Sequence, residues 1–375
     1  MVEMTAMSGA SVVLANTTIT KKMAESNVSY ESPRKNRDYE WQIVWRNVLA
    51  FVYLHVSAVY GIYLLWLGAV KVWTMLFCVM FAVMSGTGVT AGAHRLWAHK
   101  SYKARWPLRL YLALMQTMAF QNHIYEWVRD HRVHHKFTET DADPHNAKRG
   151  FFFSHMGWLM VRKHKDVFEK GASVDLSDLE KDPIVMFQKK TYLVVMPLLC
   201  FFLPAWVPVY FWGEDPWSSW YVATIMRYTI TLHFTWLVNS AAHIWGNRPY
   251  DKNIGATDNL LVGVCAFGEG WHNYHHVFPW DYKAAELGNY STNMSTALID
   301  WAAKHGLAYD LKTVSEEMIR KRVNRTGDGT HPWSKASLEA HEDHHHPENP
   351  VWGWDDHDMT EEDKQLADIV HKKTE

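Results

Sequence analysis

Histidines gather at three places in this sequence, with spacings that suit metal binding. The stretch "HRLWAH" places two histidines five residues apart, while "HRVHH" and "HNYHH" each place three within five positions. On a helix, residues i, i+3 and i+4 share a face, so each HxxHH run can aim three imidazoles into the same space. The first pair stacks less well, and we expect it to straddle the end of an apolar helix. The eight residues are His94, His99, His131, His134, His135, His272, His275 and His276.

Eight clustered imidazoles indicate a centre with more than one metal ion. A structural zinc site normally has four ligands and often uses thiolates, whereas Cys78, Cys200 and Cys265 show no metal-like spacing. Eight ligands are too many for one ion and suit two ions that keep positions open for dioxygen or a bridging oxygen. Because imidazole binds iron, copper, nickel and zinc, ligand type alone leaves the metal open. Seven other histidines are interpreted as ordinary surface or core residues: His55, His123, His145, His155, His164, His233 and His305.

Four apolar segments must position these clusters. From 47 to 93 the only charged residue is Lys71, which divides two stretches of about the ~20 residues needed to cross a bilayer. A second pair follows, and its apolar stretches carry only Arg227. The alternative, buried helices of a soluble α-helical protein, is disfavoured because each pair is joined by a very short connection. We therefore predict membrane spans at 47–69, 72–93, 191–213 and 217–241.

The distribution of charge predicts how these spans are oriented. Residues 94–190 hold seventeen lysines and arginines, whereas the connection 214–219 holds none. By the positive-inside rule, the segments outside the two hairpins face the cytosol, and so do both termini. The net charge of −2 gives no field that would attract nucleic acid, so no nucleic-acid partner is expected. The predicted fold is an all-α integral membrane protein with four transmembrane helices in two hairpins and a cytosolic helical cap formed by residues 94–190 and 242–325.

Both ends of the chain are predicted to be polar tails around a membrane domain at 46–325. Residues 1–45 lack the pattern of a cleaved signal peptide and are predicted to form a flexible cytosolic tail. Residues 326–375 are predicted to form a polar C-terminal tail. This tail contains "HEDHHH", residues 341–346, which could bind metal but lies in a stretch without apolar periodicity and is interpreted as flexible.

The residues around the histidines resemble one enzyme family over roughly residues 40–330. "TAGAHRLWAH", "EWVRDHRVHHKF" and "GEGWHNYHH", set against two hairpins, are similar to the membrane fatty acyl-CoA desaturases of the stearoyl-CoA desaturase type. The resemblance implies a diiron centre that holds two Fe²⁺ ions and uses O₂ as a co-substrate. It also implies a ninth ligand, His243 in "NSAAH", and a contact from Asn239 to one iron through a water molecule.

The same resemblance implies a binding site for a fatty acyl-CoA substrate. Without it, each residue involved would be interpreted as an ordinary polar surface residue or a packing aromatic. The two residues at the far end of the acyl tunnel are small, which is compatible with long acyl chains. The implied residues are Asn47, Asn122, Arg129, Asp130, Arg162 and Lys163 at the coenzyme A, Gln121, Trp127, Thr235 and Trp236 at the bend of the tunnel, and Ala82 and Gly86 at its far end.

Four carboxylates near the clusters are candidates to accept hydrogen bonds from the imidazoles. A metal-binding histidine usually donates its other ring N–H to a carboxylate or a carbonyl, which orients the ring. For any single one of the four, a solvated surface charge is an equally good interpretation. The candidates are Asp130, Glu139, Asp143 and Glu269.

These features lead to one favoured function and to alternatives. "GATD", residues 255–258, matches the signature of an insect subgroup, chiefly from moths, of Δ9-desaturases in the resembled family. We expect an acyl-CoA Δ9-desaturase of the endoplasmic reticulum membrane that takes electrons from cytochrome b5 and its NADH-dependent reductase, for fatty acid or pheromone-precursor biosynthesis. The enzymatic alternatives are another regiospecificity, such as Δ11, and lipid hydroxylation on the same scaffold. A membrane metal transporter or storage protein is the alternative outside enzymes, although transporters place polar ligands within their spans.

Overall fold

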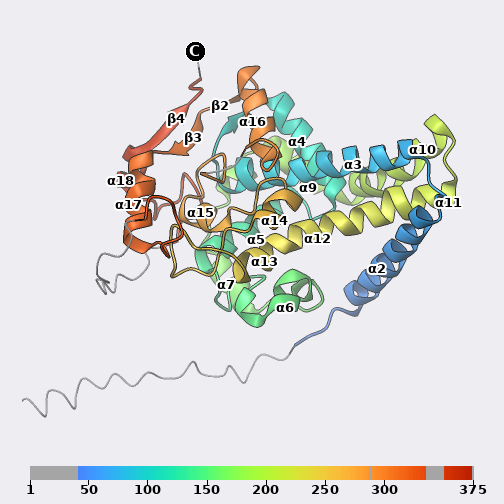
Figure 1. The fold of residues 1–375 in the computed structure, drawn as a ribbon, viewed down its shortest axis with the longest axis horizontal. Coiled ribbons are helices and arrows are strands. Elements are labelled where there is room, and N and C mark those ends of the chain that lie inside the picture. Colours follow the sequence, from blue (N-terminus) through green and yellow to red (C-terminus); the bar gives the residue numbers. More distant parts are fainter. Residues whose placement is uncertain (1–40, 287–288, 335–349, 374–375) are drawn as a thin grey trace, which may run out of the picture. The chain divides into compact units, whose positions relative to one another are not determined.

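The computed structural model describes residues 41–286, 289–334 and 350–373, which are mostly helical (Figure 1). The predicted N-terminal tail lies outside the described residues except for 41–45, and so does the histidine-rich stretch 341–346.

Three of the described helices are long and apolar enough to cross a membrane. The first is α2 (Trp45–Trp66) and the second is α3 (Val72–Thr87), which continues as a π-helix over Gly88–Ala98. The third combines α9 (Pro183–Pro197), a π-helical turn (Leu198–Phe202) and α10 (Leu203–Trp212). Large apolar side chains on these helices point outward, as lipid-facing residues do. These helices match three of the four predicted spans.

The segment predicted as the remaining span is helical but more polar. It runs through α11 (Pro216–Ser218), a π-helical stretch (Ser219–Met226) and α12 (Arg227–Asn239), and its π-helical stretch packs against α2. Arg227 is buried, donates a hydrogen bond to the Cys200 carbonyl at 3.1 Å and lies 4.6 Å from the Phe81 ring centroid. By length and composition, this segment is not among the three described helices that could cross a membrane.

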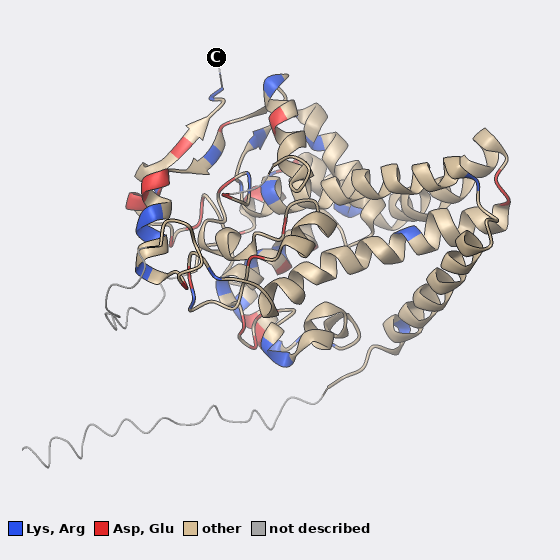
Figure 2. Cartoon of the chain, in the orientation of Figure 1, with Lys and Arg blue, Asp and Glu red and all other residues tan. Residues whose placement is uncertain are grey.

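Shorter helices make up most of the other described residues, which we call the cap. Most of the charged residues that the structure describes lie there, while α2, α3 and α9–α12 carry few (Figure 2). Side chains begin several of the cap helices: His123 accepts from the Glu126 N–H at the start of α5, and Ser315 accepts from the Met318 N–H at the start of α17. The helices are α4 (Trp106–Ala119), α5 (Ile124–Phe137), α6 (Phe151–His155), α7 (Lys165–Gly171), α8 (Ser177–Glu180), α13 (Ala241–Ile244), α14 (Leu260–Cys265), α15 (His272–Val277), α16 (Met294–Lys304), α17 (Glu316–Thr326) and α18 (Glu361–Leu366), with 3₁₀ turns at Ala147–Arg149 and Gly157–Leu159.

The cap also contains two small antiparallel sheets, which the all-α prediction did not include. Strand β1 (Lys103–Ala104) pairs with β2 (Ala308–Tyr309). Strand β3 (Leu311–Val314) pairs with β4 (Ala367–Val370), so that Leu311 lies opposite Val370. The second sheet draws the end of the chain onto the cap.

The C-terminal residues pack on the cap, in contrast to the polar tail expected over 326–375. Trp352 and Met359 are only 3% exposed, and Asp356 is 1% exposed. Trp352 packs with Val133 and Val167, so this segment shares a core with α5 and α7. The prediction missed this packing because the buried Trp352 and Met359 and the strand β4 lie within a stretch whose overall composition is polar.

Candidate metal centre

The nine predicted histidines come together in two adjacent groups. In each group, one ring nitrogen from every histidine lies within 4.8 Å of the others. The elements that bring them together are the end of the π-helix, α5, α13 and α15. We call them the five-histidine group, which contains His94, His99, His131, His135 and His275, and the four-histidine group, which contains His134, His243, His272 and His276.

The π-helix explains how His94 and His99 share one group. A π-helix bonds residue i to residue i+5, and here the His99 N–H donates to the His94 carbonyl at 3.1 Å. His94 lies inside the π-helix, and His99 follows its last residue. The two rings therefore lie on the same side of the chain with centroids 4.7 Å apart, which an α-helix would not achieve at this spacing.

Each HxxHH run divides between the two groups, whereas the sequence pattern suggested that all three imidazoles share one space. His131 and His135 on α5 enter the five-histidine group, and His134 enters the other. On α15 the division is reversed, since His272 and His276 enter the four-histidine group. The reason is angular: at about 100° per residue, positions i and i+4 differ by about 40°, but the two adjacent histidines differ by about 100°.

The spacing of the ring nitrogens fits metal ions. Two imidazole nitrogens about 3.0 Å apart repel each other if both carry lone pairs or both carry protons, unless a proton or a cation lies between them. Imidazole nitrogens that bind one ion at about 2.1 Å would lie roughly 3 Å apart. The observed Nε2 to Nε2 distances are 3.0 Å for His94 and His275, 2.9 Å for His99 and His131, 3.1 Å for His135 and His275, 3.0 Å for His243 and His272, and 3.1 Å for His272 and His276.

Burial keeps seven of these imidazoles neutral and available as ligands. Desolvation penalises the imidazolium form, and neighbouring histidines would repel an added positive charge. The pKa is therefore held well below its ordinary value, first by burial and then by the adjacent rings. This applies to His99, His131, His135, His243, His272, His275 and His276.

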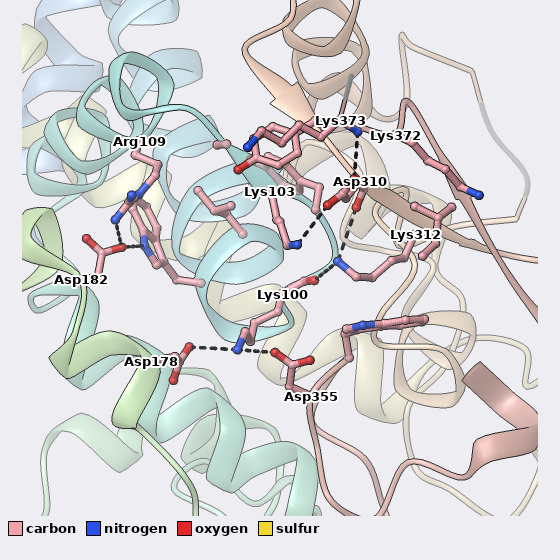
Figure 3. Close-up of a pocket in the computed structure, with 17 residues that line it drawn as sticks. Lys100, Lys103, Arg109, Asp178, Asp182, Asp310, Lys312, Asp355, Lys372 and Lys373 are labelled. Atoms are coloured by element: carbon pink, nitrogen blue, oxygen red, sulfur yellow. Dashed lines mark hydrogen bonds and ion pairs between the residues drawn. The ribbon is translucent and has the colours of Figure 1, made fainter. Parts of the chain in front are cut away.

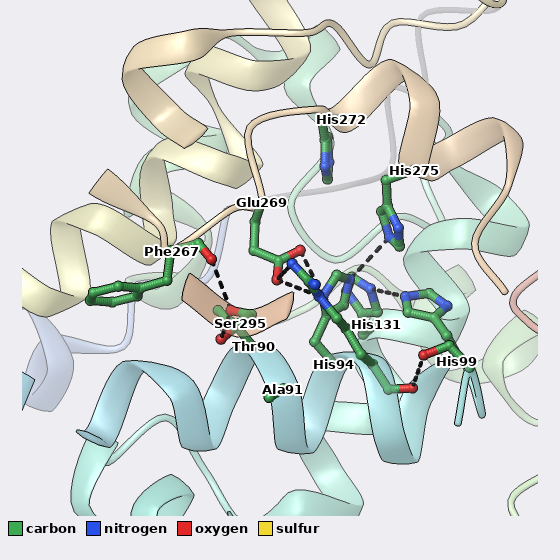
Figure 4. Close-up of polar contacts among 12 residues, drawn as sticks. Thr90, Ala91, His94, His99, His131, Phe267, Glu269, His272, His275 and Ser295 are labelled. Atoms are coloured by element: carbon green, nitrogen blue, oxygen red, sulfur yellow. Dashed lines mark hydrogen bonds and ion pairs between the residues drawn. The ribbon is translucent and has the colours of Figure 1, made fainter. Parts of the chain in front are cut away.

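Two of the four candidate carboxylates contact the histidines. Asp143 Oδ1 lies 2.9 Å from His134 Nδ1. Figure 4 shows the second contact, in which Glu269 Oε2 lies 2.9 Å from His94 Nδ1. Glu269 also accepts from Arg95 Nη2 at 2.8 Å. Burial alone would raise the pKa of both carboxyl groups, but the basic neighbours outweigh it and the pKa of each is lowered. The other two candidates point elsewhere, because Asp130 pairs with Arg129 and Glu139 with Lys148.

A third ring nitrogen has a partner that the sequence did not suggest. His99 donates from Nδ1 to the backbone carbonyl of Trp352, 253 residues further along the chain. A backbone acceptor leaves no residue-type signal, and Trp352 belongs to the stretch predicted to be a polar tail.

Two cavities meet beside the five-histidine group. The larger one, about 270 Å³, is lined by Asn47, Asn122, Asp130 and Trp236, and the smaller one, about 60 Å³, reaches Gly86. Residues lining both cavities lie at the junction, where Gln121 donates to Thr235 Oγ1 at 2.8 Å. These shared residues are Gln121, Trp127, His131, Thr235 and Asn239.

Four of the predicted substrate residues line neither of these two cavities. Arg129 and Lys163 both pair with the cavity-lining Asp130, but neither they nor Arg162 line the described cavities. At the opposite end, a Cβ on Gly86 would lie 2.1 Å from the Phe267 ring, so this aromatic side chain fills the space beside the glycine. Ala82, one turn earlier on α3, lines neither cavity.

Three histidines outside the two groups form a row rather than a cluster. His55 Nε2 lies 3.1 Å from His233 Nε2, and His233 Nδ1 lies 2.9 Å from His155 Nε2. Because His233 uses both of its nitrogens, the row does not converge on one point. His145 was expected to be an ordinary surface or core residue. It lines the larger cavity instead, and its Nδ1 lies 3.5 Å from Asp143 Oδ1.

The "GATD" stretch lies before α14 in the chain and forms hydrogen bonds with both α13 and α15. The Thr257 N–H donates to the Ala242 carbonyl at 2.7 Å. Asp258 Oδ1 accepts from the N–H groups of Asn273 and Tyr274 in the first turn of α15, at 2.9 and 3.3 Å. An acceptor at this position caps the helix. The stretch therefore fixes the two elements that supply the four-histidine group with His243, His272 and His276.

Comparisons with known proteins agree with this site. The fatty acid desaturase family model matches residues 71–287. An acyl-CoA Delta-9 desaturase of Acheta domesticus is 58% identical over 354 residues, 94% of this chain and 93% of that protein. An acyl-CoA Delta12-desaturase of the same species is 54% identical over 358 residues, 94% of each chain. Human stearoyl-CoA desaturase is 55% identical over 301 residues, 80% of this chain and 82% of that protein. The chain belongs to the fatty acid desaturase family.

Proposed function

We propose that this protein is an acyl-CoA Δ9-desaturase with a diiron centre. The observation that carries the proposal is the pair of cavities whose shared lining residues, including His131 and Thr235, lie beside the five-histidine group. The Delta-9 relative has the highest identity of the three, but the Delta12 relative is only four percentage points lower. Identity therefore supports desaturation of an acyl-CoA more strongly than it supports the position of the double bond.

The nine histidines are proposed to hold two Fe²⁺ ions, with Asn239 contacting one of them through a water molecule. Side chains alone cannot oxidise an unactivated methylene, so iron and O₂ would supply the oxidising power. The balanced reaction takes a saturated acyl-CoA, O₂, two electrons and two protons to a cis-unsaturated acyl-CoA and two water molecules. The protein's contribution is to hold the acyl chain in place. Gln121 and Thr235 hydrogen-bond where the two cavities meet, and Trp127 stacks on His131 with ring centroids 4.9 Å apart.

We place the coenzyme A at the mouth of the larger cavity. Asn47 and Asn122 line this cavity, and Arg129 and Lys163 gather on the Asp130 carboxylate near it. Cations held in this way are suited to phosphate groups. Arg162 completes the proposed set, and Trp236 lines the apolar part. The acyl chain then runs past the five-histidine group toward Gly86, and Ala82 lies one turn earlier on α3.

In a membrane, we propose four spans, with α11–α12 as the fourth, and both termini on the cytosolic side of the endoplasmic reticulum. The buried Arg227, which donates to a backbone carbonyl, is compatible with a span because its charge faces protein rather than lipid. Electrons are proposed to come from cytochrome b5 and its NADH-dependent reductase. The proposed domains are the tail at 1–45, the membrane domain at 46–325 and the C-terminal segment at 326–375, whose described part packs on the cap.

Expression in a yeast strain that lacks its own desaturase tests the function directly. Rescue of growth, with double bonds at Δ9 read by mass spectrometry, is the expected result. Products at another position would overturn the regiospecificity alone, and hydroxylated acids would favour the hydroxylase. His275→Ala is the control, which should insert normally but give no product. Purified protein with variable loading of several metals and no oxygen-dependent turnover would favour transport or storage.

A further inference from the structure

The C-terminal residues 350–359, which we call the strap, lie directly against His99. The His99 ring donates from Nδ1 to the Trp352 carbonyl, and the Trp354 N–H donates to the His99 carbonyl at 3.0 Å. The strap thus contacts both the side chain and the backbone of one member of the five-histidine group. His99 has no exposed surface, so these contacts are made in a buried environment.

Side chains on α5 and on the residue after His99 anchor the strap. The Arg132 guanidinium lies 3.9 Å from the Trp352 ring centroid, and Lys136 Nζ lies 3.0 Å from Asp356 Oδ2. Lys136 also pairs with Asp358. Figure 3 shows that Lys100 pairs with Asp355. Further along, the pairing of β4 with β3 holds the chain end to the cap. The strap is therefore fixed at several points around the histidine.

The strap also approaches His99 more closely than a side chain would permit. A Cβ on Gly353 would lie 2.4 Å from the His99 carbonyl oxygen and 2.8 Å from its Cα. These neighbours are backbone atoms, which cannot rotate away. A larger residue at 353 must move the strap, and with it the carbonyl of the preceding residue, Trp352.

We propose that the strap is a positioning element for the metal centre. By accepting the Nδ1 proton of His99, the Trp352 carbonyl fixes the tautomer whose Nε2 lone pair faces the five-histidine group. Loss of such a partner typically reduces metal affinity by about 10- to 100-fold. The inference rests on the proposed function, because it assumes that His99 is an iron ligand. It predicts that disturbing the strap weakens iron binding in the five-histidine group and leaves the four-histidine group loaded.

Gly353→Ala in the full-length protein tests the proposal by iron content and by the rate of iron release to a chelator. Wild type should hold two irons per chain, whereas Gly353→Ala should hold about one. Iron in the five-histidine group of the variant should be released to the chelator at least about 10-fold faster than in wild type. The control is Gly306→Ala, whose added Cβ meets no atom within 4 Å but is strained at φ +69°, so it should lower stability while keeping two irons with wild-type release. Adding His272→Ala to Gly353→Ala should remove the remaining iron, whereas adding His275→Ala should leave it in place.

Several outcomes would overturn the proposal. Two irons with wild-type release from Gly353→Ala, or equal loss from both groups together with a lowered unfolding temperature, would show that the strap is merely structural. Asp356→Ala provides a second variant if Gly353→Ala does not fold, since it removes the carboxylate that accepts from Trp352 N–H at 2.8 Å without entering the space of His99. Iron-free wild-type protein would instead count against the proposed function itself.

Discussion

Gly86 offers the sharpest test of where the acyl chain ends. It lines the smaller cavity, and any side chain added there would point at the Phe267 ring, with a Cβ to Cε2 distance of 2.1 Å. Leucine at this position would press four carbon atoms against Phe267 at the end of the smaller cavity, which leaves less room there for an acyl chain. Gly86→Leu should therefore close the end of the tunnel and favour shorter substrates.

The magnitude follows from the methylenes that no longer fit. Burying one methylene contributes about 0.8 kcal/mol, so each one excluded should lower kcat/KM about fourfold. A leucine that displaces two methylenes costs about 1.6 kcal/mol, or about 15-fold, and one that displaces four costs about 3 kcal/mol, or about 200-fold. We expect the preference for an 18-carbon over a 14-carbon acyl-CoA to fall by between about 15- and 200-fold.

Competition between the two acyl-CoA substrates, with products counted by mass spectrometry, measures this ratio in one reaction. Retained activity on the 14-carbon substrate serves as the internal control that the metal centre is intact. Val79→Leu is the matched leucine substitution, because Val79 lies on the same helix but is 64% exposed, and it should leave the ratio unchanged. In a double variant, Phe267→Ala should restore part of the long-chain activity. An unchanged ratio in active Gly86→Leu enzyme would refute the tunnel-end assignment.

Three further predictions concern the metal centre. His272→Ala and His275→Ala each remove a ligand from a different group, so elemental analysis should find about one iron per chain in each single variant and none in the double variant. Asp143→Asn removes the carboxylate beside His134 Nδ1, and a chelator titration should show affinity reduced by about 10- to 100-fold. Asp258→Ala leaves the first turn of α15 uncapped, and thermal unfolding of the detergent-solubilised protein should report a loss of about 0.5–2 kcal/mol.

Sequence reasoning predicted the parts of this fold that follow a local period. The apolar runs that became α2, α3 and α9–α10 were visible because membrane spans are long and uniform. The α11–α12 segment is less uniform, since Arg227 and its polar neighbours serve packing against other helices. The strand pairing of β3 with β4 joins residues more than fifty positions apart, and such pairing leaves no periodic signal in either short strand.

The metal centre, like the fold, could be predicted from the sequence only in part. Eight of the nine histidines could be picked from their spacing alone, because ligands on one helix face recur at fixed intervals. Which group each histidine joins depends on a π-helix at His94 and on the rotation of α5 and α15, which spacing does not encode. The partners of the Nδ1 atoms are only partly predictable. Glu269 was a candidate but contacts His94, which lies far from it in the sequence, and the Trp352 carbonyl was not foreseen. Sequence can therefore identify the atoms able to bind metal, whereas the tertiary structure decides which nitrogen of each ring keeps its proton, and so which one is free to bind.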